Sequence, residues 1–253
     1  GIIAGINAHL KVHGKEPFVL RRDESYIGVL IDDLITKGVD EPYRMFTSRA
    51  EYRILLRQDN ADLRLTEKSY RIGLASEERY RLMTEKYETV RDLARMGDEV
   101  NLRADVINDY LSESNSATLS ESKRISDLAS RPEISLDELL NFVPRGTFDT
   151  FSVVLPEGED IGSSQRRKEI IDSVEIGVKY KGYIEREKSI AEKIARLEDL
   201  KIPQDFDFDK VSGLTIECRQ KLLRYKPTTI AQASRISGVS PADISVLLVY
   251  FGR

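Results

Sequence analysis

A helical hydrophobic period between Ser76 and Gly97 constrains the fold more than any other feature of this sequence. Ser76 is a favourable N-cap, Glu77 complements the helix dipole, and Gly97 is expected to end the helix. The apolar stripe recurs every three or four residues and consists of Tyr80, Met83, Tyr87, Val90 and Leu93 or Ala94. This spacing predicts one long amphipathic helix.

Two further helices are predicted near the start of the chain. The first runs from Ile2 and ends near Gly14, and the second lies between Ser25 and Gly38. The stripe of the second helix is expected to consist of Leu30, Leu34 and either Ile27 or Ile31. The first pattern begins at Gly1 with no N-cap before it, so we expect this chain to be the C-terminal part of a longer protein.

The longest helical pattern covers residues 164–200, and Gly177 and Gly182 weaken it locally. Before it, Ser135 and Glu138 have the spacing of a capping box. A Ser-rich stretch at 112–122 predicts a mobile loop. The fold class is therefore mainly α.

Three short helices are predicted in the tail. Thr215 caps the first, Thr229 and Gln232 form a capping box for the second, and Ser240 with Asp243 opens the third. Their core is expected to use Leu214, Leu222, Ile230, Ala233, Ile236, Val239, Ile244, Leu247 and Leu248. We therefore predict a compact terminal bundle.

Composition excludes several classes of protein. Hydrophobic residues make up 40% and charged residues 32%, and no apolar run is long enough to cross a bilayer. The single cysteine, Cys218, excludes an internal disulfide framework and favours the cytosol. The two histidines, His9 and His13, lack further ligands with metal-binding spacing, and no nucleophile motif is present. The chain by itself therefore looks non-catalytic.

An arginine-rich stretch, "YRMFTSRAEYRILLRQDNADLRLT", stands out in a chain of net charge -4. Its apolar core, "ILL", favours a strand or extended segment packed on a domain outside this chain. Arg49, Arg53 and Arg57 share one face in either a helix or a strand. Two interpretations stay open: contact with RNA phosphates, or internal ion pairs with three nearby acids, Glu51, Asp59 and Asp62.

A second basic group lies at the start of the longest helical pattern. Arg166, Arg167 and Lys168 oppose the helix dipole there, which slightly favours a ligand. The alternative is an ordinary solvated helix face.

Several long strings carry a family resemblance. The arginine-rich stretch, the preceding "SYIGVLIDDLITKG", "GIIAGINA", "VEIGVKYKGYIEREK" and "SRISGVSPADISVLLVY" resemble the MnmG (GidA) family of tRNA-modifying flavoproteins, in family order along nearly the whole chain. The resemblance implies a glutathione-reductase-like flavin domain, of which this chain keeps a remnant, followed by a helical C-terminal domain ending in a small helical bundle.

The resemblance also implies a reaction. With the GTPase MnmE, the family adds a carboxymethylaminomethyl group to C5 of the wobble uridine of certain tRNAs, using FAD, NADH and a folate-derived one-carbon unit. It implies a cytoplasmic homodimer without a membrane segment. The FAD loop and the catalytic residues would precede Gly1, so no catalytic residue is assigned to this chain.

Site residues follow from the same resemblance. The family's arginine-rich segment makes Arg44, Arg49, Arg53 and Arg57 the preferred tRNA contacts, while Arg64 is expected to be structural. Two further expected tRNA contacts are Arg166 and Arg167. The residues expected to contact the partner are Glu217, Lys221 and Arg224.

Three segments are expected: the end of the FAD-binding domain with a connector at 1–64, a helical domain at 65–203, and the bundle at 204–253. Two alternatives stay open. The paired "SGL" and "SGV" turns would suit a stand-alone helical nucleic-acid module that binds phosphate through backbone amides. The other alternative is a structural dimerisation module.

Overall fold

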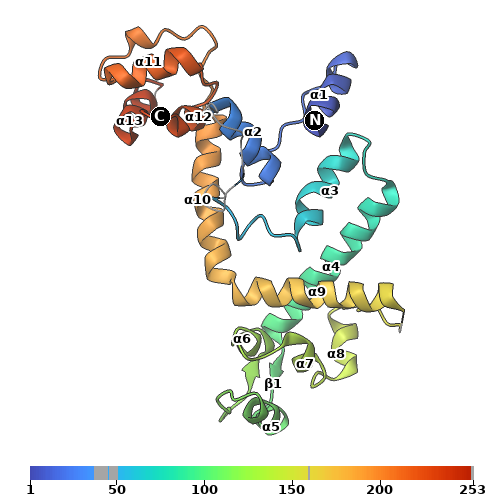
Figure 1. Ribbon diagram of the computed structural model, residues 1–253. Helices are drawn as coiled ribbons and strands as arrows, with labels where there is room; N and C mark the ends of the chain where they lie inside the picture. The colour runs from blue at the N-terminus through green and yellow to red at the C-terminus, as the bar shows by residue number, and fades with distance from the viewer. Residues whose placement is uncertain (37–44, 46–50, 159, 252–253) are drawn as a thin grey trace. The chain divides into compact units, whose positions relative to one another are not determined.

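The computed structural model describes residues 1–36, 45, 51–158 and 160–251 of this 253-residue chain. The described residues are mainly helical, as predicted, and they divide into two compact units (Figure 1). Unit 1 comprises residues 1–56 and 186–253, and unit 2 comprises 57–185. No helix among these described residues combines the length and apolar character that crossing a bilayer requires. The three segments expected above stay a prediction.

Unit 2 contains seven helices among its described residues and one short antiparallel pair of strands. The helices are α3 (Ala61–Arg71), α4 (Glu77–Glu99), α5 (Ala104–Glu113), α6 (Ile125–Ala129), α7 (Leu136–Leu140), α8 (Arg145–Thr150) and α9 (Ile161–Lys179). Strands β1 (Asn101–Leu102) and β2 (Lys123–Arg124) pair antiparallel, with Asn101 opposite Arg124.

The core of unit 2 lies among α4, α5, α6, α7 and α9. Its fully buried members include Leu93, Met96, Ile107, Ile125, Leu128, Leu139 and Ile170. Ser76 caps α4 as predicted, by accepting a hydrogen bond from the Arg79 amide. The predicted end at Gly97 is wrong, because α4 continues to Glu99 and Gly97 is buried against Ser126 of α6. The missing side chain at this glycine permits close packing rather than ending the helix.

Two further helix predictions need correction. Ser135 is the N-cap residue of α7, but its side chain makes no capping bond. Glu175 of α9 instead accepts a hydrogen bond from the Leu136 amide at 2.7 Å. The long pattern at 164–200 is two helices, α9 and α10 (Lys181–Asp199), separated at Tyr180. Glycines at 177 and 182 flank this break, where helix propensity is lowest.

Unit 1 contains α1 (Ile2–Val12), α2 (Tyr26–Thr36), most of α10, the 3-10 turn η2 (Phe208–Lys210), α11 (Ile216–Tyr225), α12 (Ile230–Arg235) and α13 (Pro241–Tyr250). The predicted stripe of α2 is wrong in part, since Leu30 and Ile31 are partly buried as expected but Leu34 is not. Val29 and Asp33 are buried, whereas Leu34 and Ile27 are exposed. Asp33 is buried because an arginine pairs with it, a contact that apolar periodicity does not register.

The short apolar run in the arginine-rich stretch is a series of turns, so the expected strand is wrong. The amides of Leu55 and Leu56 both donate to the Tyr52 carbonyl. Tyr52 and Leu56 are buried with Val29 and Ala191. The run therefore finds its packing partners inside this chain.

The predicted terminal bundle is confirmed. Seven of its expected core residues are buried, and Val239 and Leu248 pack partly buried against them. Thr215 caps α11, and Ser240 forms a complete capping box with Asp243 at α13. At α12, Thr229 accepts from the Gln232 amide, but the Gln232 side chain accepts from Thr228 instead of Thr229. The tail is thus organised by local caps around one small core.

Gly28 permits the start of α2 to approach the preceding turn. A Cβ there would overlap the Arg21 carbonyl oxygen and lie 2.6 Å from that of Leu20. Gly28→Ala is expected to lower the free energy of unfolding by about 1–3 kcal/mol, because the backbone at Leu20 and Arg21 would have to move away from the new methyl group. The matched control Gly5→Ala, inside α1 with open space around it, should raise it by about 0.5–1 kcal/mol. Urea titration followed by circular dichroism measures both, and an unchanged midpoint for Gly28→Ala would contradict the expectation.

Candidate functional site

The arginine-rich stretch presents one open cation among its described residues. Arg44 and Arg49 lie outside the residues that the structure describes. Arg53 is exposed and makes no hydrogen bond or ion pair with any described residue. Arg57 pairs with Asp59 at 3.1 Å. The structure therefore leaves Arg53 available to an external anion.

The three acids near this stretch have different partners. Glu51 pairs with Arg22, and Asp62 pairs with Lys86 at 2.9 Å. Only Asp59, the third of them, has its described ion pair with an arginine of the stretch. Arg64 donates to the Asn60 side chain and to the Arg57 carbonyl. This local bonding agrees with a structural role for Arg64.

A buried charge network in unit 1 was not predicted. Arg22 is 5% exposed and its guanidinium pairs with three carboxylates, those of Asp32, Asp33 and Glu51, at 2.9–3.0 Å. Burial alone lowers the pKa of a guanidinium, but the hydrogen bonds and charges of these acids outweigh it and raise the pKa of Arg22. The network fixes the 21–24 turn on α2.

Arg235 extends this network to the terminal bundle. From the end of α12, its guanidinium pairs with Asp32 at 2.7 Å and with Glu198 of α10 at 2.6 Å. Glu198 also accepts a hydrogen bond from the N-cap hydroxyl of Thr229. Asp32 is therefore shared by two arginines, and through it α12 is held to α2. The helical pattern of the sequence did not indicate that Asp32 would pair with two arginines.

Arg166 and Arg167, the basic pair at the start of α9, face carboxylates of unit 2. Arg166 donates to the Leu82 carbonyl at 3.0 Å and pairs with Glu85 at 3.3 Å. Arg167 pairs with Asp137 at 2.7 Å. Both guanidiniums thus have internal partners in this structure, while keeping part of their surface exposed.

Lys86 lies at the centre of a second network in unit 2. Its ammonium, almost fully buried, contacts Asp62 at 2.9 Å and Glu169 at 3.2 Å, and the Tyr87 hydroxyl donates to Asp62. Burial alone raises the pKa of Asp62, but the bonds from Tyr87 and Lys86 outweigh it and lower that pKa. Apolar periodicity predicted that Tyr87 faces the core, but it did not predict the burial of Lys86. The pattern counts only apolar side chains, whereas an ammonium with carboxylate partners can be buried as well.

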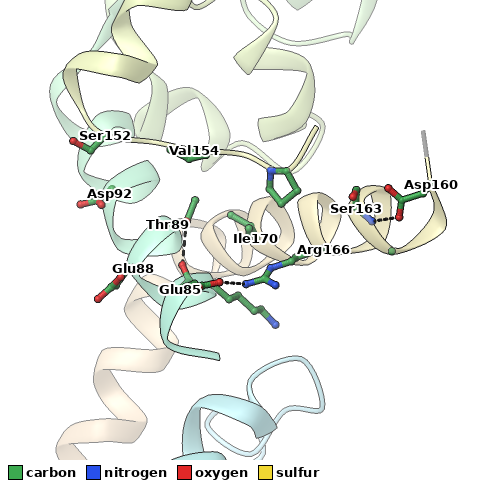
Figure 2. Close-up of a pocket in the computed structure, with 13 residues that line it drawn as sticks. Glu85, Glu88, Thr89, Asp92, Ser152, Val154, Asp160, Ser163, Arg166 and Ile170 are labelled. Atoms are coloured by element: carbon green, nitrogen blue, oxygen red, sulfur yellow. Dashed lines mark hydrogen bonds and ion pairs between the residues drawn. The ribbon is translucent and has the colours of Figure 1, made fainter. Parts of the chain in front are cut away.

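A groove of about 760 Å³ lies between α4, α9 and the segment before α9 (Figure 2). Glu85, Glu88 and Asp92 of α4 line one side. Thr89 and Ile170 supply less polar surface between the walls. Asp160 adds a fourth carboxylate to the lining, and Lys86 and Arg166 supply two cations. The acids outnumber the cations, which does not favour an anionic ligand such as a nucleotide pyrophosphate.

The expected partner-binding residues lie on α11. Glu217 and Arg224 are exposed and Lys221 is half-buried. Glu217 also has a packing role, because a Cβ on Gly238 would lie 3.0 Å from its carboxyl carbon. Gly238 has φ +95, so its turn both requires glycine and accommodates this side chain.

The paired glycine turns do not form an open phosphate site. Asp243 is 2% exposed, and its carboxylate accepts hydrogen bonds from the Thr215 and Ser240 amides, both at 2.9 Å. It therefore occupies the place that a phosphate would take at the two turns. This geometry disfavours the nucleic-acid module suggested by the repeated turns.

The described residues offer no metal cluster of three or more ligating side chains. The His9 and His13 rings lie with their centroids 4.1 Å apart and are tilted by 35°, and the His13 Nδ1 contacts the His9 carbonyl. Cys218 is fully buried in α11, and burial, with the charge of Asp243 adding to it, raises the pKa of its thiol to about 12. A buried thiol with a raised pKa disfavours a reactive thiolate at Cys218.

Two family models match the chain. The model described as the C-terminal helical domain of the tRNA modifying enzyme MnmG/GidA matches residues 77–188. The model described as the C-terminal helical bundle of the same enzyme matches residues 190–253. Together they cover α4 to the end of the chain.

Curated relatives and solved structures agree with these matches. The chain is 53% identical over 253 residues to the tRNA uridine 5-carboxymethylaminomethyl modification enzyme MnmG of Bacteroides fragilis, and 49% identical to that of Flavobacterium psychrophilum. It spans 39% of the length of each. It is also similar to Aquifex aeolicus GidA, with a TM-score of 0.76 and 43% identity over 99% of this chain and 36% of that one.

Proposed function

This chain belongs to the MnmG/GidA family of tRNA-modifying enzymes, as its C-terminal part, and from that premise we propose the activity of the whole protein. With MnmE, it adds a carboxymethylaminomethyl group to C5 of the wobble uridine of certain tRNAs, as a cytoplasmic homodimer. The observation that carries this proposal is the match along all 253 residues to MnmG enzymes.

FAD and NADH belong to the proposal as groups held outside this chain. The groove of unit 2 does not favour a dinucleotide, since more carboxylates than cations line it. The sequence also has no glycine-rich phosphate loop. We therefore assign this segment binding roles and no redox step. A flavin-domain remnant in residues 1–64 is part of the same proposal.

The segment's first role is to support tRNA binding through the arginine-rich stretch. Arg53 is the described member that supports this best, because its guanidinium is exposed and has no partner among the described residues. Arg44 and Arg49 belong to the proposal on the family resemblance alone. Arg57, Arg166 and Arg167 would have to exchange their present carboxylate partners for phosphate.

The second role is to dock MnmE through α11. Exposed Glu217 and Arg224, with half-buried Lys221 between them, offer charges of both signs along one short helix. Ile216, 77% exposed at the start of the same helix, adds an apolar contact. A mixed charged and apolar patch of this kind suits a protein partner better than RNA.

Arg53→Ala in the full-length enzyme tests the proposed function. We expect weaker tRNA binding, a slope of log affinity against log salt that falls by about 1, and less modified uridine in tRNA. Bound flavin and co-purification of MnmE should not change, because Arg53 touches neither in this proposal. Filter binding at several salt concentrations and nucleoside mass spectrometry measure the effect.

Arg91→Ala is the matched control, since Arg91 is an exposed arginine of α4 outside the stretch. An equal loss of affinity in both variants would indicate a general charge effect. Unchanged tRNA binding in Arg53→Ala would remove Arg53 from the tRNA surface. Absence of the modified uridine from tRNA treated with the unaltered enzyme and MnmE would overturn the proposed activity itself.

A further inference from the structure

The groove of unit 2 is bounded by an extended segment, and most of its backbone groups make no hydrogen bond with any described residue. Figure 2 shows this segment, from Ser152 past Val154, opposite the acidic side of α4. Val153 is buried and Leu155 packs on the same core, whereas Val154 between them is 76% exposed. This alternation is that of an extended chain.

Beyond Val153, the backbone polar groups of this extended segment have no partners among the described residues. The Val153 amide donates to the Phe148 carbonyl, and it is the last backbone amide before α9 with a described bond. The amides of Val154, Leu155 and Glu157 and the carbonyls of residues 154–157 bond to no described residue, while Pro156 has no amide hydrogen to donate. An extended segment with free backbone groups is a template for pairing with another strand.

The wall of α4 that faces this segment carries negative charge, so it favours a ligand with positive charge. Glu88 is exposed and has no ion pair or hydrogen bond among described residues. Asp92 lies one turn further along α4 and has a long, 3.3 Å bond to Arg95. Glu85 is neutralised by Arg81 and Arg166. The open negative charge of the groove is therefore concentrated at Glu88 and Asp92.

We propose that this groove docks an extended, lysine- or arginine-rich polypeptide segment of a partner protein. Its backbone pairs with Leu155 and Glu157, the edge that Pro156 does not occupy. Its cationic side chains meet Glu88 and Asp92, and their aliphatic stems lie along Ile170 and Val154. This mode combines strand addition, which supplies affinity, with side-chain pockets that select sequence. RNA is disfavoured because its phosphates would face these carboxylates.

The test uses the full chain and a fluorescent peptide of alternating lysine and valine, with binding followed by anisotropy. Glu88→Lys is expected to weaken binding about fivefold, since one attractive charge becomes repulsive. Methylating alternate amides of the peptide should weaken binding about tenfold, because it removes backbone hydrogen bonds and keeps every charge. A peptide of alternating glutamate and valine should not bind.

Glu113→Lys is the matched control, an exposed acid of α5 that does not line the groove, and it should bind the peptide like the parent. Equal weakening by Glu113→Lys and Glu88→Lys would mean non-specific charge attraction and would overturn the proposal. Equal binding of methylated and unmethylated peptides would exclude strand pairing. Displacement of the peptide by single-stranded RNA, with RNA affinity raised by Glu88→Lys, would reassign the groove to nucleic acid.

Discussion

Arg22→Ala is expected to lower the free energy of unfolding of unit 1 by about 3–5 kcal/mol, the largest effect of any single substitution considered for this chain. The guanidinium is almost fully buried and compensates Asp32, Asp33 and Glu51. The Asp33 side chain has no exposed surface, so the loss of Arg22 would remove the guanidinium that compensates its buried charge. Denaturant unfolding followed by circular dichroism measures the loss.

Arg21 provides the control from the neighbouring position. Its guanidinium is 49% exposed and pairs with Asp23, an arrangement that contributes less than about 1 kcal/mol. Arg21→Ala should therefore shift the unfolding midpoint only slightly. If the two alanine variants unfolded at the same denaturant concentration, the Arg22 network would not hold unit 1 together.

Asp243→Ala is the second large effect, and we expect a loss of about 3–4 kcal/mol from the terminal bundle. Its carboxylate accepts bonds from the Thr215 amide at the start of α11 and from the Ser240 amide and hydroxyl at the start of α13. The substitution would leave donors at two helix starts without their acceptor. Thermal unfolding of the chain measures the loss.

Asp243→Asn separates charge from hydrogen bonding in this cap. Asparagine keeps the size and one acceptor oxygen, so it should lose less stability than alanine. The two variants being equally destabilised would mean that only the ionised carboxylate matters. An Asp243→Ala variant as stable as the parent would contradict the double-cap interpretation.

The same residue predicts a pH dependence. Burial raises the pKa of Asp243, but the hydrogen bonds from Ser240 and Thr215 outweigh burial and lower it to about 2. A folded pKa below the unfolded value, about 3.9, gives stability that is present above pH 4 and is lost as the pH falls toward 2. Asp243→Asn should lack this part of the acid destabilisation, which unfolding at pH 2.5 and pH 6 would detect.

Local features of this protein were predictable from sequence. Ser76, Thr215 and Ser240 act as N-caps where they were predicted, because a cap bonds an amide two or three residues away. The core of the terminal bundle was also predicted, because short capped helices leave few ways to bury their apolar faces. The sequence segments that resemble the family could also be recognised, since such a resemblance depends only on the order of residues.

Features that depend on distant partners were not predictable. Ser135 has a cap sequence, yet Glu175, forty residues away in the chain, supplies the bond to α7. The arginine-rich stretch shows the same limit. Its spacing placed Arg53 and Arg57 on one face, but only the fold paired Arg57 with Asp59 and gave Glu51 to Arg22.

The sequence by itself determined that this chain is helical, where most of its helices begin, and which family it resembles. Only the tertiary structure decided which charges are buried in pairs and which remain open, as at Arg22 and Arg53. The physical reason is the separation along the chain between the residues that interact. Capping and helical periodicity act within a turn or two, whereas a charge finds its partner through the packing of segments far apart in the chain, as Arg235 does with Asp32.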